Sequence, residues 1–341
     1  MRLATCRLPG EPGPLTGVVL GNAVVPLREL AATGPGTELD RSLAGLDLAG
    51  LLAADPGLAR LRRALDAAPA ERLANAAVPI ARVRLAPPVR PGKAICVGQN
   101  YRRHIEEQGI PLPDRPVLFA KFGNAVVADR EPVRRPDVTH ALDQEAELGV
   151  VIGRRARRVS AADALACVAG YTALNDVSAR DLQGQRPALR EGEHGDGQWL
   201  RAKGADTFLP LGPIIVTPDE LPDSRHPGLR VRSWRTPANG GGAGREVAMQ
   251  EGRTDDMVWD VAALIAFISE VITLEPGDVI ATGTPPGVGV WRYPPVFLEP
   301  GDVVRVEVEG IGSLTNPIVD AAGSAPPDSP AATLLADVPA R

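Results

Sequence analysis

Two glutamates separated by a single residue stand at the start of an apolar segment: Glu145 and Glu147 lead into the run Leu148–Ile152. In a β-strand alternate side chains point to the same face, so the two carboxylates would share one face with their backbones about 6.5–7 Å apart. Like charges held this closely repel each other unless a cation or solvent lies between them. Because oxygen ligands alone select hard ions, the pair predicts a site for Mg²⁺, with Mn²⁺ or Ca²⁺ as alternatives and Zn²⁺ disfavoured.

A third carboxylate could complete that site. Asp176 follows a second apolar segment, and the dense polar run after it contains Arg180 and Gln183. By itself the glutamate pair fits an ordinary solvated strand face. Other polar segments accompany this pair along the chain, and together they favour a metal site formed by Glu145, Glu147 and Asp176.

Further segments carry groups that act on anions or move protons. Lys203 precedes a β-like segment, and Thr284 lies in the glycine-rich loop 281–289. Such a loop lets backbone N–H groups approach a ligand closely. His104 and Glu107 are three residues apart, which places both on one side of a helical turn.

The order of these segments resembles the fumarylacetoacetate hydrolase family. The resemblance extends over roughly residues 90–320 and rests on short motifs that occur in the same order: Gly98-Gln99-Asn100-Tyr101 with His104-Ile105-Glu106-Glu107, Phe119-Ala120-Lys121, residues 143–148, residues 175–183, Lys203, residues 283–289 and residues 294–302. Chance similarity does not produce so many motifs in one order.

The resemblance implies a catalytic domain built as a mixed β-sandwich roll, and it implies a homodimer. It also implies that Glu145, Glu147 and Asp176 bind Mg²⁺ or a similar ion. The substrates that it implies are small 2-oxo or 1,3-dicarbonyl acids.

For such substrates the resemblance favours a hydrolase that cleaves a C–C bond, of the acylpyruvate or fumarylpyruvate type. The metal would act as a Lewis acid and stabilise the enolate that forms, and Lys203 would add positive charge beside it. His104 would take a proton from water while Glu107 orients the imidazole ring. The groups expected to hold the substrate's carboxylate and carbonyl oxygens are Arg180, Gln183 and Thr284.

Other activities share the metal and Lys203. They are the decarboxylation of oxaloacetate-like acids, the tautomerisation of 2-hydroxydienoates, and a biosynthetic step for which a member of the family was recruited. The pair of His104 and Glu107 separates hydrolysis from these, because only hydrolysis needs an activated water. A binding protein without activity is disfavoured, since every candidate catalytic position is filled.

The elements that position these residues predict a mostly β (α+β) fold with a small N-terminal α/β domain over residues 1–88. Residues 17–26 predict two short strands joined by a Gly-Asn turn, and residues 56–75 predict a helix. Prolines near residue 90 mark the end of this domain. It carries no recognisable chemistry, which favours a docking or dimer-supporting role.

The catalytic domain is expected over residues 89–320. Ser160 should cap a short helix over 161–169, and Thr254 a longer one with an apolar stripe that reaches Ile272. Strands are expected at residues 94–98, 147–153 and 171–174.

The sequence also predicts several of the connections between these elements. Two similar turns, Glu275–Asp278 and Glu299–Asp302, should each open a strand. The glycine-rich stretch 237–245 predicts a hairpin insertion, and the long polar stretch 185–198 could shape substrate access. Residues 321–341 predict a flexible C-terminal tail.

Composition excludes several classes of function. The net charge of -5 over 341 residues offers no basic face to nucleic acid. No apolar run reaches the about 20 residues that a membrane span needs, and no secretory signal is recognisable. Three scattered cysteines form no CxxC pair, and no GxGxxG motif supports a nucleotide cofactor. We therefore expect a soluble, cytoplasmic enzyme.

Overall fold

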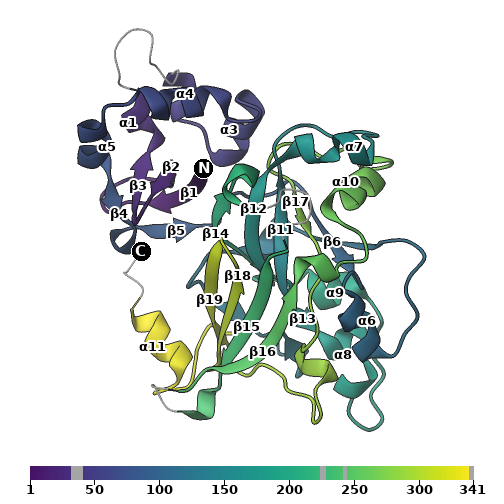
Figure 1. Cartoon of the computed structure of the whole chain (residues 1–341). Coiled ribbons are helices and arrows are strands. Elements are labelled where there is room, and N and C mark those ends of the chain that lie inside the picture. Colours follow the sequence, from purple (N-terminus) through teal and green to yellow (C-terminus); the bar gives the residue numbers. More distant parts are fainter. Residues whose placement is uncertain (32–40, 223–227, 241–243, 338–341) are drawn as a thin grey trace.

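The computed structural model describes residues 1–31, 41–222, 228–240 and 244–337. The fold is mostly β and contains two large sheets (Figure 1). In spatial order, the long sheet runs through β4 (Val78–Pro79), β3 (Ala23–Pro26), β2 (Leu15–Leu20), β1 (Arg2–Arg7), β14 (Leu209–Val216), β12 (Val168–Asn175), β11 (Ala146–Ile152), β17 (Val279–Ala281), β6 (Ala94–Gly98) and β7 (Val117–Lys121). Two short strands join it, β5 (Arg84–Ala86) beside β1 and β8 (Val126–Val127) beside β14.

The second sheet covers the middle of the long one. It runs through β16 (Val247–Arg253), β15 (Arg230–Thr236), β18 (Val303–Val308), β19 (Gly312–Val319) and β9 (Val133–Arg134). Its strands β15, β18 and β19 contact β11, β12 and β14 (Figure 1). The predicted β-sandwich is confirmed, and the apolar core lies between the two sheets.

The central strands β11 and β12 pair antiparallel, with Ala146 opposite Asn175 and Leu148 opposite Ala173. Every residue of β11 is buried. A strand that is covered on both faces reads as a nearly continuous apolar run, which is why the sequence predicted this pair well. The predicted carboxylates lie at the seam where β11 begins and β12 ends.

The N-terminal region shares the long sheet. The hairpin β2–β3 has the predicted Gly21-Asn22 turn, and β1 pairs antiparallel with β14, placing Leu3 opposite Ile215. The hydrogen-bonded sheet therefore crosses the predicted boundary at residue 88. That boundary stays a prediction.

Helices of the N-terminal region lie over its part of the sheet (Figure 1): α1 (Leu27–Ala31), α2 (Arg41–Ala44), α3 (Leu48–Ala54), α4 (Ala59–Ala67) and α5 (Ala70–Ala76). The single helix predicted over 56–75 is wrong, because the structure divides it into α4 and α5. The reason is Pro69, which disfavours the helical conformation of the residue before it. Ala68 is accordingly extended and ends α4.

Two predicted helix boundaries are wrong in the catalytic region. Ser160 does cap α7 (Ala161–Ala164), but a 3₁₀ turn, η3 (Leu165–Cys167), follows it, and Val168 already pairs with Ile152 in β12. Tertiary pairing has taken the end of the predicted helix into the sheet.

Thr254 does not cap the long helix. It starts a 3₁₀ turn, η7 (Thr254–Asp256), and its hydroxyl accepts a hydrogen bond from the Leu229 backbone at 3.0 Å. The helix α10 (Val261–Ser269) is capped by Asp260, whose side chain accepts from Ala263 N at 2.7 Å. The predicted stripe is buried over the length of α10, where it consists of Val261, Leu264, Ile265 and Ile268.

The twin turns are confirmed. Gly277 and Gly301 have φ values of +88° and +104°, which glycine adopts without steric cost. In each turn the last aspartate accepts a hydrogen bond from the backbone of the first glutamate, Asp278 at 2.8 Å and Asp302 at 2.9 Å. The strands β17 and β18 follow directly.

The glycine-rich insertion and the predicted tail are described in part. The stretch 237–245 joins the hairpin strands β15 and β16, and its residues 241–243 lie outside the described ranges. Within 321–341 the chain forms α11 (Pro330–Ala336), which Ser329 caps and whose Ala331 is buried. Residues 338–341 lie outside the described ranges. None of the helices described has the length and apolar character that crossing a bilayer requires.

The first prediction concerns the buried turn before β17. Asp278 accepts hydrogen bonds from the backbone of Glu275 at 2.8 Å and of Lys93 at 2.9 Å, and it pairs with the Lys93 ammonium at 2.7 Å. Asp278→Ala leaves buried N–H groups unpaired, which should lower the free energy of unfolding by about 1–3 kcal/mol. Urea denaturation measures the loss. Asp137→Ala, at an exposed site, is the matched control and should change stability by less than about 0.5 kcal/mol; equal effects of the two substitutions would contradict the role of the turn.

Candidate active site

Three carboxylates meet at the seam between β11 and β12. Glu145 directly precedes β11, Glu147 lies within it, and Asp176 directly follows β12. The Asp176 backbone donates to Glu145 O at 2.9 Å, and Asn175 Oδ1 accepts from Glu145 N at 2.9 Å. One carboxylate oxygen from each of Glu145, Glu147 and Asp176 lies within 4.8 Å of the others. The structure therefore brings the predicted triad together in a buried position.

Three cations surround this triad. Lys203, at the end of α9 (Trp199–Lys203), contacts Glu145 Oε2 at 2.6 Å and Asp176 Oδ2 at 2.8 Å. Arg180, at the start of α8 (Arg180–Gln183), contacts Glu145 Oε1 at 2.6 Å. Lys121, at the end of β7, contacts Asp176 Oδ1 at 2.7 Å.

Glu147 differs from its two neighbours. Among the described residues no cation contacts it within ion-pair distance, and its hydrogen bond comes from Gly283 N, in the glycine-rich loop, at 2.8 Å. Burial and the nearby charges of Asp176 and Glu145 hold the pKa of Glu147 well above its ordinary value. Burial would also raise the pKa of Glu145, but Arg180 and Lys203 overcome it and lower that pKa instead.

A divalent cation fits this arrangement. The donor set is all oxygen and negatively charged, as hard ions prefer. Glu147 is a buried carboxylate whose charge is uncompensated, and a cation between the three oxygens would supply the missing opposite charge. The residues that would hold the ion are those that the sequence predicted, and the kind of ion is not distinguished by the geometry.

The predicted His104 and Glu107 pair is formed. Both lie on α6 (Arg102–Gln108), and His104 Nδ1 is 2.6 Å from Glu107 Oε1. Glu107 in turn accepts a hydrogen bond from Gly287 N at 3.0 Å, which ties it to the glycine-rich loop. The carboxylate thus fixes the orientation of the ring and leaves Nε2, which has no partner among the described residues, as the nitrogen available to a ligand.

The predicted site residues line one pocket over the triad. Helices α6, α8 and α9 each contribute side chains to it. The three helices are grouped together in Figure 1, and α8 contacts α9. Predicted residues on its wall are His104, Glu145, Glu147, Arg180, Gln183, Lys203 and Thr284. Residues that the sequence did not nominate complete the wall, among them Gln99, Gln108, Gln185, Trp199 and Trp291.

The three predicted substrate-binding groups are already engaged within the chain. Arg180 holds Glu145, pairs with Asp143 through Nε at 2.9 Å, and donates to Gln183 Oε1 at 3.1 Å. The Thr284 hydroxyl donates to Ala146 O at 2.9 Å and accepts from Gln250 Nε2 at 2.7 Å. These groups border the pocket, and their part in substrate binding stays a prediction.

Lys121 and Asp143 were not nominated from the sequence. The buried Lys121 ammonium donates to three backbone carbonyls, those of Val177, Lys203 and Phe208, at 2.6–2.9 Å. It therefore holds the backbone beside Asp176 and at Lys203 while it pairs with the Asp176 carboxylate. The signal that could have identified Lys121 from the sequence is its place at the end of an apolar strand.

Asp143 joins Arg180 to the glycine-rich loop. Besides pairing with Arg180, it accepts hydrogen bonds from Gly289 N at 2.8 Å and Val290 N at 3.1 Å. Its place two residues before Glu145 was the signal for it. One carboxylate thereby positions the loop, Arg180 and, through Arg180, Glu145.

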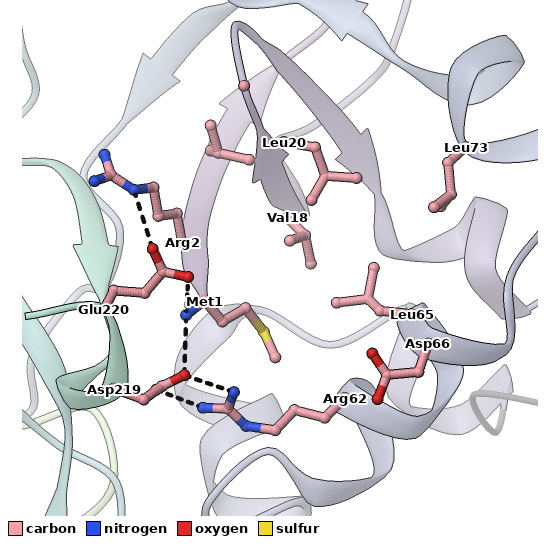
Figure 2. A pocket seen from close by; sticks show the side chains of 12 residues that line it. Met1, Arg2, Val18, Leu20, Arg62, Leu65, Asp66, Leu73, Asp219 and Glu220 are labelled. Atoms are coloured by element: carbon pink, nitrogen blue, oxygen red, sulfur yellow. Dashed lines mark hydrogen bonds and ion pairs between the residues drawn. The ribbon is translucent and has the colours of Figure 1, made fainter. Parts of the chain in front are cut away.

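A larger hollow lies elsewhere, between the N-terminal hairpin and the 3₁₀ turn η5 (Pro218–Glu220) (Figure 2). Its floor is apolar, and two ion pairs lie at its rim: Arg62 binds Asp219 through two hydrogen bonds of 2.7 and 2.8 Å, and Arg2 lies 3.8 Å from Glu220. Within the described ranges no histidine lines it, and its acidic residues are not grouped closely enough to hold a metal ion. The smaller pocket over the triad is the candidate active site.

Comparisons with known proteins show what this chain is similar to. The sequence profile described as "Fumarylacetoacetate (FAA) hydrolase C-terminal" matches residues 93–319. A human protein named as a mitochondrial oxaloacetate tautomerase is 41% identical over 324 residues, which are 94% of this chain and 92% of that protein.

Two solved structures illustrate the range of reactions among similar folds. The 2-hydroxyhepta-2,4-diene-1,7-dioate isomerase from Mycobacterium marinum is 34% identical with a TM-score of 0.64, covering 94% of this chain and 98% of that one. The maleylpyruvate hydrolase from Sphingobium sp. SYK-6 is 29% identical with a TM-score of 0.69, covering 94% and 100%.

The second prediction tests the uncompensated glutamate. A carboxyl whose pKa is higher in the folded protein than in the unfolded chain binds more protons when folded, so stability falls as pH rises above the ordinary value of about 4.3. In metal-free protein, Glu147→Gln should therefore raise Tm by an amount that grows between pH 4 and pH 8. Saturating Mg²⁺ should reverse the order, because only the wild type keeps the full ligand set.

Glu106→Gln on the exposed side of α6 is the control for this experiment and should show neither effect. Thermal denaturation at several pH values, with and without Mg²⁺, provides the measurement. A Tm difference that is independent of both pH and Mg²⁺ would show that Glu147 is an ordinary core residue.

Proposed function

The chain belongs to the fumarylacetoacetate hydrolase family, and from that membership and the site we propose that it is a metal-dependent enzyme that interconverts the keto and enol forms of a short 2-oxo dicarboxylic acid such as oxaloacetate. The observation that carries the proposal is the buried triad with Lys203 beside it and the oriented His104 above it. The human relative named as an oxaloacetate tautomerase supports the choice of reaction. It favours the isomerase alternative over the C–C hydrolase that the sequence put first.

Each residue has a defined part in this reaction. Glu145, Glu147 and Asp176 would hold the divalent ion, which when bound polarises the 2-oxo group as a Lewis acid. His104 Nε2 takes a proton from C3 as the C2–C3 double bond forms, and Glu107 keeps the ring in place. The Lys203 ammonium stabilises negative charge at the 2-oxo oxygen until a proton returns to it.

Burial makes these charges effective. Burial would lower the pKa of Lys203, but Asp176 and Glu145 outweigh it and raise that pKa, so the side chain stays cationic. The ammonium also lies 5.0 Å from the centre of the Phe119 ring, on the apolar side of the site. A fixed cation in such surroundings acts on developing charge more strongly than it would in water.

Hydrolysis of a C–C bond is the second candidate. The specific observation in its favour is the His104 and Glu107 pair, which could equally take a proton from water. The similar maleylpyruvate hydrolase supports it. The two reactions differ in whether oxygen from water enters the product.

Assembly and location stay proposals. We retain Mg²⁺ as the ion and a homodimer as the assembly, both on the family resemblance. The cytoplasmic location remains a prediction, and the name of the human relative places that protein in mitochondria.

The third prediction concerns His104. His104→Ala should lower the Mg²⁺-dependent rate of oxaloacetate tautomerisation by about 10²–10⁴-fold, the range typical of a lost general base. The rate is followed by loss of enol absorbance, corrected for the reaction in buffer. His194→Ala, at an exposed site, should have no effect, and unchanged turnover in His104→Ala would remove the histidine from the mechanism.

The fourth prediction separates the two reactions. With acetylpyruvate in D₂O enriched in ¹⁸O, a tautomerase should exchange C3 hydrogen for deuterium without releasing acetate, whereas a hydrolase should release acetate that carries ¹⁸O. We expect exchange alone, and we expect a chelator to abolish it until Mg²⁺ is restored. Labelled acetate formed at the rate of exchange would favour the hydrolase, and activity that survives the chelator would exclude the metal.

A further inference from the structure

Besides Gln183, whose side-chain oxygen accepts a hydrogen bond from Arg180, three side-chain amides lie on the wall of the candidate active-site pocket. Gln99, Gln108 and Gln185 line it, and each is half-buried. In the part of the chain that the structure describes, none of these three amide groups has a hydrogen-bond partner. Arg180 and Lys203 on the same wall differ, since each contacts two carboxylates.

The backbone presents Gln99 from a fixed position. Its φ of +55° lies in the left-handed region, which residues other than glycine adopt infrequently. The next residue, Asn100, is buried and holds this conformation through its side chain, which donates to Thr282 O at 2.7 Å and to Trp259 O at 3.1 Å. A strained conformation that is anchored so firmly places the Gln99 side chain in the pocket.

The other two amides are also held by regular structure. Gln108 follows His104 by four residues on α6, so both side chains lie on the same side of that helix. Gln185 follows the left-handed Gly184 that ends α8, and its backbone donates to Arg180 O at 3.0 Å. The amides therefore surround the space next to the histidine and the arginine.

The charges of the site leave no cation for a second substrate carboxylate. The three cations of the cluster, Lys121, Lys203 and Arg180, face four carboxylates, those of the triad and Asp143. A divalent ion would turn the excess of one negative charge into an excess of one positive charge. One carboxylate of the substrate would balance that charge at the triad, and a second one would have only neutral groups to meet.

We infer that Gln99, Gln108 and Gln185 form a neutral amide subsite that binds the end of a 2-oxo acid remote from the carboxylate triad. The inference deepens the proposed function and rests on it. Amide N–H groups donate to carboxylate, carboxamide and ketone oxygens alike. The subsite therefore selects 2-oxo acids with an oxygen-bearing distal group and does not require that group to be charged.

The substrate series follows directly. Replacing the distal carboxylate of oxaloacetate with a carboxamide should lower kcat/KM by less than about tenfold, because hydrogen bonds from neutral donors are exchanged for similar ones. Exchange of C3 hydrogen, followed by NMR, measures both compounds. A loss above a hundredfold for the carboxamide would overturn the inference, since it would show that a cation binds the distal group.

Charge-changing variants test the residues themselves. Gln99→Glu and Gln185→Glu keep the shape of the side chain, remove its donors and add a negative charge. In Mg²⁺-loaded protein they should weaken the binding of malate, an unreactive analogue with a distal carboxylate, by at least about tenfold. Oxalate, which has no distal group, should bind within about twofold of the wild type. Isothermal titration calorimetry measures both.

Gln198→Glu is the matched control, because Gln198 is exposed and lies outside the pocket. It should change neither affinity. Equal weakening of malate and oxalate in Gln99→Glu and Gln185→Glu, no change in either, or failure of the wild type to bind both ligands would overturn the subsite. Wild-type binding of malate and oxalate without turnover of oxaloacetate would contradict the proposed function and leave the subsite standing.

Discussion

The compensation of buried carboxylate charge is the constraint on which the rest of this structure depends. One carboxylate oxygen from each of Glu145, Glu147 and Asp176 lies within 4.8 Å of the others, and all three side chains are buried. Charges taken out of water are tolerated only when opposite charges and hydrogen bonds replace the lost hydration. Lys203, Lys121 and Arg180 supply that replacement for two of the three acids. Glu147 is left over, and its charge is the one that a cation bound at the cluster would compensate.

The two sheets hold that cluster in a fixed arrangement. The antiparallel register of β11 and β12 sets the separation of the ligands, and the buried turn at Asp278 fixes β17 beside β11. The second sheet supports the glycine-rich loop through Gln250 of β16, which donates to Thr284 Oγ1 and to Pro285 O. Because the loop also binds Glu107 and Asp143, the proposed base, the arginine and the proposed metal ligands are coupled through one backbone segment.

Some polar groups on the pocket wall are hydrogen-bonded within the chain and others are not, and this difference bears on substrate specificity. Arg180 and Thr284 match the family motifs, yet their polar atoms stabilise the site itself. Gln99, Gln108 and Gln185 on the pocket wall belong to no charged network among the described residues and remain available to a ligand. In the proposed site, one end of a 2-oxo acid would be held electrostatically and the other end would be bound by hydrogen bonds. That division fits a family whose similar members include both isomerases and hydrolases.

Local sequence determined much of this protein. Apolar runs predicted β6, β11 and β12, the Glu-Pro-Gly-Asp repeats predicted the twin turns, and the alternation of a strand predicted that Glu145 and Glu147 share a face. Each of these rests on contacts between near neighbours in the chain, which the sequence displays directly. The ends of helices were harder to predict from the sequence, because Pro69 divides one predicted helix and pairing with β11 shortens another. Only the tertiary structure decided the partners across long separations: Lys121 and Lys203 on Asp176, Asp143 on the loop at Gly289, and the free amide of Gln99 in the pocket. The physical reason is that compensation of a buried charge depends on which groups the fold brings within about 3–4 Å, and spacing along the chain does not contain that information.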